Sequence, residues 1–263
     1  MILKLLTLML SLLLPLCWAT DLPKSPTYII LVGPPGSGKG TLSEKIAAKS
    51  QLPVITTSQV LKRQLDANTA QAKQIKQKMA AGELISDDTI LAVMKDEIAK
   101  PQYTNGAIFD GFPRTASQTQ FFEDNDLTVQ MVVVLNISDD EIVRRMQGRR
   151  VHGPSGRVYH VDNRPPVTPG VDDVTGELLE QRADDQPDIV RSRLTQYHSM
   201  TKPVISWANG ETMSVNGIVQ QVIELNADQD LEQIWTSLCK KAPSQDAELS
   251  LIHISEPTRQ KPI

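Results

Sequence analysis

The sequence predicts an α/β protein with a parallel sheet flanked by helices, one small helical insertion and one β-rich insertion. Two observations predict this class. From Thr27 onward, short apolar runs alternate with longer helical stretches, a pattern typical of parallel sheets covered by helices. A glycine-rich turn over residues 33–40 joins the first apolar run to the first helical stretch. The length of 263 residues is ample for one large domain with inserted subdomains.

The individual elements follow from apolar periodicity. The predicted strands are compact apolar runs bounded by turn residues or charges, at Tyr28–Val32, Ala107–Asp110, Met131–Ile137 and Val222–Leu225. The predicted helices are Lys39–Ser50, Thr69–Ala80, Asp87–Lys100, Asp139–Arg150, Arg182–Ala208 and Asp228–Lys240. Ser138, followed three residues later by Glu141, has the spacing of a capping box and marks a helix start.

Two segments interrupt this alternation. Residues 151–180 are rich in Gly, Pro and Asp and contain the alternating stretch Arg157–Val161, which indicates a small β-rich insertion. Residues 56–85 read as a second, helical insertion. Insertions into a scaffold are where binding and catalytic residues concentrate, so both are expected to serve the site.

Composition excludes some classes of partner. The formal net charge of −4 argues against nucleic acid, because a nucleic-acid-binding domain normally carries a basic stripe. The chain has only two cysteines, Cys17 and Cys239. Cleavage of an N-terminal leader over residues 1–19 would remove Cys17 and leave one cysteine, so we expect no internal disulfide in the mature monomer.

Residues 1–19 have the pattern of a signal peptide. Lys4 precedes an apolar run from Leu5 to Leu16, and small residues at Cys17 and Ala19 come before the expected cut. The run is interrupted by polar residues and proline, and is short for crossing about 30 Å of hydrocarbon. We expect a periplasmic or secreted protein without stable membrane association after cleavage. An uncleaved membrane anchor and a cytoplasmic location are the alternatives. An intact N-terminus found on cytoplasmic protein would overturn the expected export.

Residues 242–263 lose helical periodicity and contain three prolines. We expect an unstructured tail. The stretch SLIHISEPTRQKPI resembles translated sequencing-adapter read-through; whether residues 247–263 belong to the natural protein is left open, and we assign them no function.

The glycine-rich turn is the most informative motif. The sequence GPPGSGKGT spans residues 33–41 and lies between a predicted strand and a predicted helix. Glycines allow successive backbone N–H groups to face one anion, and the helix N-terminus adds partial positive charge. Lys39 can then reach the outer phosphates of a bound nucleotide. Gly40 separates Lys39 from Thr41, so contact of that hydroxyl with magnesium is less direct than in the usual pattern.

This loop and the later motif GFPRT (111–115) resemble adenylate kinases, members of the nucleoside monophosphate kinases. The likeness runs from about Thr27 to Pro203 and includes TTSQVLKR (56–63), AGELI (81–85), GRRVHGPSGRVYHV (148–161), DDVTGE (172–177) and RADDQPDIVRSRL (182–194). The resemblance implies a P-loop core over residues 20–55, 86–148 and 186–241. It further implies a monophosphate-binding insertion over 56–85 and a lid over 149–185 that closes on ATP.

The resemblance also implies roles for individual residues. The cations around the transferred group would be Lys39, Arg114, Arg149, Arg182 and Arg193. ATP would be bound by Gly36, Ser37, Gly38, Lys39, Gly40, Thr41, Arg145 and Arg149. AMP would be bound by Thr57, Lys62, Ile85, Gly111, Arg114, Gln118, Arg182 and Arg193. Asp110 would orient Mg²⁺ through water, and Asp184 and Asp185 would close the lid.

Physical chemistry agrees with such a set of cations. Phosphoryl transfer spreads negative charge over the phosphate oxygens, so catalysis is mainly positioning and charge neutralisation. A reaction between two polyanionic nucleotides therefore needs several cations in one cleft. An amide such as that of Gln118 can pair bidentately with adenine.

The lid resembles the long-lid form of the family. Where zinc-binding relatives have cysteines, this chain has His152, Ser155, Asp172 and Thr175. The resemblance implies a hydrogen-bond network of these four side chains, and we predict no zinc.

The chain departs from the family pattern on the acceptor side. The family usually has Thr-Gly-Asp followed by Arg three residues after the Asp, whereas this chain has Thr57, Ser58, Gln59 and then Lys62. Lysine lacks the planar fork with which arginine grips phosphate. Arg63 lies about 100° further around a helix and is an imperfect substitute. We therefore expect weakened AMP binding or a shifted acceptor preference, with ATP binding retained.

Two alternatives stay open. One is a nucleoside monophosphate kinase that uses UMP, CMP or GMP, against which Gln118 and the long lid argue. The other is an exported nucleotide-binding protein without catalysis, against which the retained lysine and arginines argue. The resemblance implies a monomer whose partners are ATP and AMP.

Overall fold

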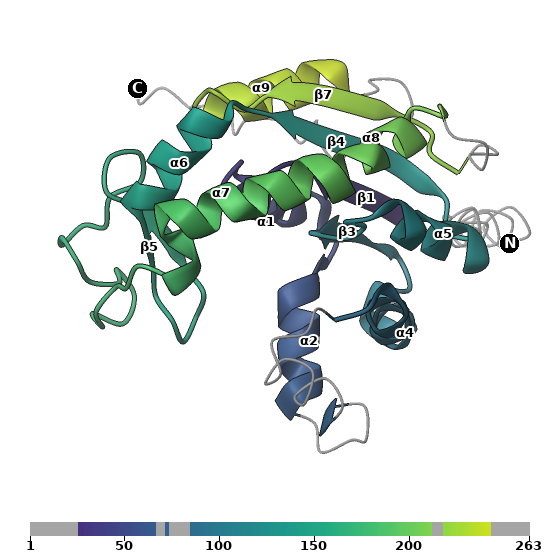
Figure 1. The fold of residues 1–263 in the computed structure, drawn as a ribbon, viewed down its shortest axis with the longest axis horizontal. Coiled ribbons are helices and arrows are strands. Elements are labelled where there is room, and N and C mark those ends of the chain that lie inside the picture. Colours follow the sequence, from purple (N-terminus) through teal and green to yellow (C-terminus); the bar gives the residue numbers. More distant parts are fainter. Residues whose placement is uncertain (1–25, 67–71, 74–84, 212–217, 243–263) are drawn as a thin grey trace, which may run out of the picture.

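The computed structural model describes residues 26–66, 72–73, 85–211 and 218–242 (Figure 1). The predicted leader, nearly all of the predicted helix Thr69–Ala80 and the tail beyond residue 242 lie outside these residues. Within the described ranges, no helix has the length and apolar character needed to cross a membrane.

The centre of the protein is a five-stranded sheet in the order β2-β3-β1-β4-β7, and every pair of neighbours is parallel. The predicted α/β class with a parallel sheet is therefore confirmed. The strands are β1 (Thr27–Val32), β2 (Val54–Thr56), β3 (Gly106–Asp110), β4 (Val129–Asn136) and β7 (Val222–Asn226). The short edge strand β2 was not predicted, because three residues after a proline carry almost no periodic signal.

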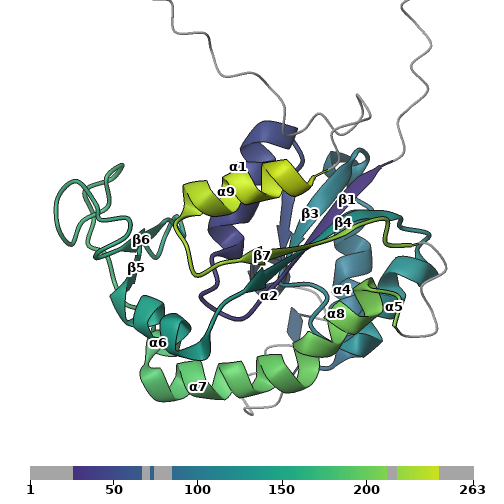
Figure 2. The same cartoon turned by 90° about the horizontal axis from the view of Figure 1, so that it is seen from above.

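Helices cover both faces of the sheet (Figure 2). On one face lie α1 (Lys39–Ser50) and α9 (Leu231–Lys241), and on the other lie α4 (Asp87–Ile98), α5 (Ala116–Asp124) and α8 (Lys202–Ala208). Strand β1 contributes side chains to the hydrophobic layers on both faces of the sheet, because successive side chains of a strand point to opposite faces. Ile29 and Leu31 belong to the cluster under α1 and α9, while Ile30 and Val32 belong to the opposite cluster.

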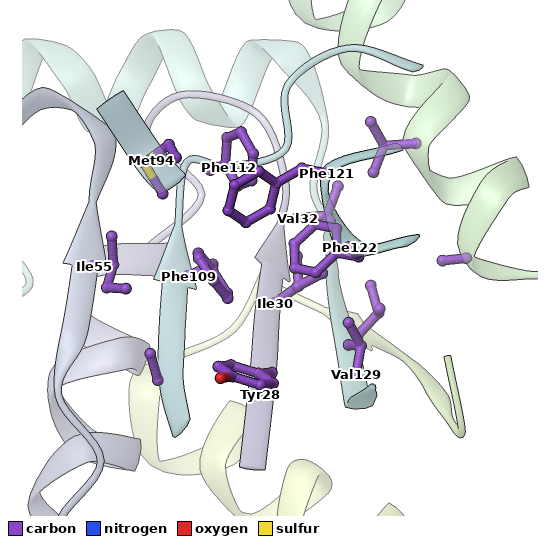
Figure 3. Close-up of a cluster of buried hydrophobic side chains, with 14 of the residues drawn as sticks. Tyr28, Ile30, Val32, Ile55, Met94, Phe109, Phe112, Phe121, Phe122 and Val129 are labelled. Carbon is purple, nitrogen blue, oxygen red and sulfur yellow. The ribbon is translucent and has the colours of Figure 1, made fainter. Parts of the chain in front are cut away.

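An aromatic cluster fills the second of these layers (Figure 3). Phe122 is fully buried and packs edge-to-face against Phe109 and Phe121, with ring centroids 5.3 and 5.6 Å apart. It also contacts Phe112 and Trp207. The cluster joins β3, α5 and α8, and so supports the segment between β3 and α5 that carries the GFPRT motif.

Two parts project from this core (Figure 1). Helix α2 (Thr57–Asp66) extends away from the sheet beside α4, within the predicted helical insertion. The antiparallel pair β5 (Arg149–Val151) and β6 (Val158–His160) lies beyond α6 (Asp139–Gly148), within the predicted lid.

Four predicted helices differ from the observed ones. The helix predicted to Lys100 ends at Ile98. The helix predicted over Arg182–Ala208 is wrong as one element. It divides into a 3-10 turn (Ala183–Asp185), α7 (Pro187–Gln196), a π-helical turn (Tyr197–Thr201) and α8. Pro187 and Pro203 occupy the first turns of α7 and α8, where the missing N–H of proline costs least. The helix predicted to Arg150 ends at Gly148, because the next residues pair with β6. The last helix begins at Leu231, after the N-cap Asp230.

Replacing Phe122 by alanine should lower the free energy of unfolding by about 3–5 kcal/mol, because the change leaves a cavity among four aromatic neighbours. Urea unfolding monitored by circular dichroism would measure the loss. Val167→Ala is the control, since that side chain is 88 % exposed and should change stability little. A loss below about 1 kcal/mol for Phe122→Ala would contradict the central role of this cluster.

Candidate active site

The phosphate loop lies between the end of β1 and the start of α1. Gly36 and Gly38 have φ angles of 80° and 92°, a left-handed backbone that favours glycine. A Cβ on Gly36 would also approach the Met146 sulfur to 2.8 Å. The turn therefore depends on glycine both for its backbone angles and for space. Helix α1 begins at Lys39 and directs its N-terminus at the loop, which is the arrangement that binds phosphate.

The ammonium group of Lys39 is hydrogen-bonded to the backbone of the phosphate loop. Nζ donates to the carbonyl oxygens of Gly33 and Pro34 at 2.7 and 2.8 Å, and lies 3.4 Å from the Ser37 hydroxyl. Loss of hydration is the largest cause of a Lys39 pKa lowered to about 8. The Asp110 carboxylate opposes this shift, and three positive charges add to it, those of Arg114, Arg193 and Arg149.

The five cations predicted from the sequence form one electrostatic cluster. Arg114 and Arg182 both have lowered pKa values, for which loss of hydration is the first cause. Repulsion from Arg193 contributes to both shifts, and Arg149 contributes to that of Arg182. The five side chains come from α1, the loop after β3, β5, the segment before the 3-10 turn, and α7. The fold thus brings together charges that are distant in the sequence.

Two aspartates partly neutralise this cluster. Arg149 makes a bidentate pair with the fully buried Asp185, with Nε donating to Oδ2 at 2.9 Å. Arg193 donates from Nη1 to Asp184 Oδ2 at 2.6 Å. The family resemblance implies that both aspartates close the lid, and in the structure they hold two of the clustered arginines in place.

Asp110 lies at the end of β3, next to the phosphate loop. Its Oδ2 is 3.5 Å from the position of a Cβ on Gly40. Loss of hydration raises its pKa, against the opposing charges of Lys39 and Arg114. In the part of the chain that the structure describes, no group of three His, Cys, Asp or Glu side chains could hold a metal ion. One carboxylate beside a phosphate site fits Mg²⁺, which is usually bound by one or two carboxylates, water and substrate phosphates.

Arg145 lies on α6, outside the set of charges that act on Lys39. Its Nε donates to Glu141 Oε1 at 2.7 Å, and Nη2 lies 3.4 Å from the carbonyl oxygen of Gln229. These contacts hold the Arg145 side chain, which is 18 % exposed, between α6 and the segment before α9.

Several predicted acceptor-site residues are joined by hydrogen bonds. Thr57 Oγ1 and Arg114 Nε each donate to the carbonyl oxygen of Gly111 at 2.8 Å. Gln118 Oε1 accepts from the Arg114 backbone N–H at 2.7 Å. The predicted residues Lys62 and Ile85 are not among the residues joined by these contacts.

Arg63 does not replace the arginine that is missing at position 62. Its Nη2 donates to Glu97 Oε1 at 2.8 Å, and that carboxylate is 1 % exposed. Lys100 and Tyr103 bond to the same carboxylate. Arg63 therefore ties α2 to α4, while Lys62 is exposed on α2.

The four predicted lid residues belong to one network. His152 Nδ1 lies 2.7 Å from Ser155 Oγ, and Thr175 Oγ1 donates to Asp172 Oδ2 at 3.0 Å. His152 and Asp172 are both almost fully buried, and His152 Nδ1 lies 4.0 Å from Asp172 Oδ1. These contacts connect β5 with the turn over residues 172–177.

Sequence reasoning missed three members of this network, Arg157, Tyr159 and Glu177. Arg157 forms a bidentate pair with Asp172 at 2.7 and 2.6 Å, and the Tyr159 hydroxyl donates to the same carboxylate at 2.9 Å. Glu177 Oε2 lies 2.5 Å from His152 Nε2. The hydrogen bonds, led by that from Arg157, hold the pKa of Asp172 far below its usual value. The available signal was the i, i+2 spacing of Arg157 and Tyr159, which puts both on one face of a strand.

The affinity of the loop for ATP should fall as the pH rises through about 8, because protonated Lys39 is the form that attracts the phosphates. If bound ATP restores the ordinary lysine pKa, the dissociation constant rises about tenfold between pH 7 and pH 9. Isothermal titration calorimetry would measure it. Lys39→Met should bind ATP more weakly, and its dissociation constant should lack the rise with pH that is caused by deprotonation of Lys39. Any pH dependence that comes from titration of ATP itself should be the same in both proteins. Parallel pH profiles for the two proteins would contradict the assignment.

One comparison with known proteins bears on this site. A family model described as adenylate kinase matches residues 31–213, which is 213 − 31 + 1 = 183 of the 263 residues. The match includes the phosphate loop, the five clustered cations and the lid network. The chain therefore belongs to the adenylate kinase family.

Proposed function

We propose that this protein is an adenylate kinase that catalyses the reversible, Mg²⁺-dependent reaction of ATP with AMP to give two ADP. Membership of the family supports nucleoside monophosphate kinase activity and the use of Mg²⁺ with ATP. The observation that carries the proposal is the cluster of Lys39 with four arginines beside the phosphate loop. A site with this much positive charge suits a reaction that joins two phosphate chains.

The reaction needs charge neutralisation more than proton transfer. The attacking phosphate oxygen of a monophosphate is already ionised at neutral pH, since its second pKa is about 6. Lys39 and the arginines would neutralise the oxygens of the transferred group, and the hydrogen bonds of Arg149 and Arg193 limit the freedom of their side chains before nucleotide binds. Mg²⁺ bound with ATP adds positive charge between the phosphates, and Asp110 is the residue that would hold it through water.

The choice of AMP as acceptor rests on Arg114 and Gln118. Arg114 would bind the monophosphate, and its Nε contact with Gly111 O fixes the start of its guanidinium. Gln118 follows it on α5 and would pair with the base. The amide keeps one N–H and one lone pair after its contacts within the protein, which is the capacity that bidentate pairing with adenine requires.

A coupled assay with ATP, Mg²⁺ and each of AMP, GMP, CMP and UMP would test the proposal. We expect turnover with AMP at a kcat/KM at least tenfold above that with any other acceptor, about the discrimination that one good pairing of base and side chain provides. A preference for GMP, CMP or UMP would indicate another nucleoside monophosphate kinase. Binding of ATP without turnover of any acceptor would indicate a nucleotide-binding protein that lacks catalysis.

Lys62→Arg should lower the KM for AMP by about tenfold and change kcat less, because arginine can form a bidentate bond with phosphate where lysine is a point charge. Steady-state kinetics with AMP as the varied substrate would measure both constants. Arg63→Lys is the matched control: position 63 contacts Glu97, and a lysine can keep that ion pair, so the KM for AMP should stay within about twofold. An unchanged KM and kcat in Lys62→Arg would show that position 62 does not contact the acceptor.

A further inference from the structure

Asp87 accepts three hydrogen bonds from the segment that carries the acceptor-site residues. It is the first residue of α4, and its Oδ2 accepts from the hydroxyls of Thr115, at 2.7 Å, and Ser117. Its Oδ1 accepts from Gln118 Nε2 at 2.7 Å. The side chain is half-buried. It is linked directly to the amide that would read the base, and it was not among the site residues expected from the sequence.

These contacts fix the orientation of the Gln118 amide, that is, which side its oxygen and its nitrogen face. Loss of hydration raises the pKa of Asp87, but hydrogen bonds from Ser117, Thr115 and Gln118 outweigh it and lower the pKa overall. At neutral pH the group is therefore a carboxylate, which only accepts hydrogen bonds. The backbone N–H of Arg114, on the other side of the amide, only donates. A turned amide would set N–H against N–H and oxygen against carboxylate, so Nε2 must face Asp87.

A fixed amide discriminates between purines. After its two contacts within the protein, Gln118 keeps one N–H at the end near Asp87 and one lone pair at the end near Arg114. A 6-aminopurine presents an amino donor beside the N1 acceptor, whereas a 6-oxopurine presents an oxygen acceptor beside the N1–H donor. Because Arg114 holds the phosphate, the base cannot slide along the amide to exchange the positions of its donor and acceptor groups. Only one of the two purine classes then matches a given amide orientation.

We propose that Asp87 is a positioning residue for base selectivity, which locks Gln118 in the orientation that pairs with a 6-aminopurine monophosphate and disfavours a 6-oxopurine. The inference rests on the proposed function, in which AMP is the acceptor. Asp87 touches neither substrate in this scheme. It acts through Gln118, and its effect is on selectivity.

The adjacent Asp88 provides a matched control. It lies in the same first turn of α4, where either carboxylate interacts favourably with the helix dipole. Asp88 is exposed, and its side chain takes no part in the contacts of Asp87 with Thr115, Ser117 and Gln118. A neutral residue at either position therefore removes the same dipole interaction, but only position 87 controls the amide.

The test compares the full chain with Asp87→Asn and Asp88→Asn, using ATP with AMP or with IMP as acceptor. Asparagine keeps the shape of the side chain but can turn either its oxygen or its nitrogen to Gln118. We expect Asp87→Asn to raise the KM for AMP about tenfold, to change kcat less, and to lower the AMP-to-IMP ratio of kcat/KM about tenfold or more. Asp88→Asn should keep the wild-type ratio. Thermal unfolding would confirm that each variant is folded.

A double-mutant cycle separates positioning from general support of the fold. If Asp87 acts through Gln118, then Asp87→Asn should leave the AMP-to-IMP ratio unchanged in a Gln118→Ala background. The proposal is overturned if Asp87→Asn keeps the wild-type ratio, if Asp88→Asn lowers it equally, or if the effect persists without Gln118. A wild type that turns over no monophosphate would defeat the proposed function instead. The same ratio, measured as calorimetric affinities for AMP and IMP, would still decide the role of Asp87.

Discussion

The mutual repulsion of Lys39 and four arginines is the constraint on which the site depends. After loss of hydration, repulsion from neighbouring arginines contributes to the lowered pKa values of Lys39, Arg114 and Arg182. Like charges placed this close would separate if the side chains were free to move. The fold opposes this in two ways. Asp185 and Asp184 each pair with one arginine, and the buried sheet fixes the backbones that carry Lys39 and Arg114. The protein therefore holds an unfavourable concentration of positive charge that phosphate groups can relieve, which is the form of preorganisation that stabilises a polyanionic transition state.

Much of the core and of the ATP side could be predicted from the sequence, because the signals there are local. The turn from Gly33 to Gly40 requires glycine for its backbone angles, and the runs that became β1 and β3 are strongly apolar. The misses share a physical cause. Strand β2 is set by its pairing with the distant strand β3, and Thr201 in the π-helical turn donates to the carbonyl oxygen of Arg114, far away in the sequence. The partners of Asp172 and the three donors to Asp87 likewise come from elsewhere in the chain. The spacing of Arg157 and Tyr159 indicates that the two share a face, but not which carboxylate they meet.

The acceptor side shows why a neighbouring residue does not replace a missing one. Arg63 follows Lys62 directly, yet it serves Glu97, a carboxylate that is only 1 % exposed. Turning Arg63 toward a bound phosphate would leave that buried charge with fewer partners, at a cost that a partly exposed phosphate contact does not easily offset. The alterations at Ser58, Gln59 and Lys62 are thus left without compensation from the adjacent arginine. The hydrogen bonds from Thr57 and Arg114 to the carbonyl oxygen of Gly111 hold these other predicted acceptor-site residues in place.

The order of the strands explains how both halves of the site meet. Strands β1 and β3 are separated by more than seventy residues in sequence but are neighbours in the sheet. Because they are parallel, their carboxyl ends lie at the same edge, and this is where ligands bind in open α/β sheets. The loop after β1 carries the phosphate-binding backbone and Lys39, and the end of β3 carries Asp110 and then Arg114. In the proposed function, the donor and acceptor sites would therefore form at adjacent strand ends, and the arginines of β5 and α7 complete the cluster of cations.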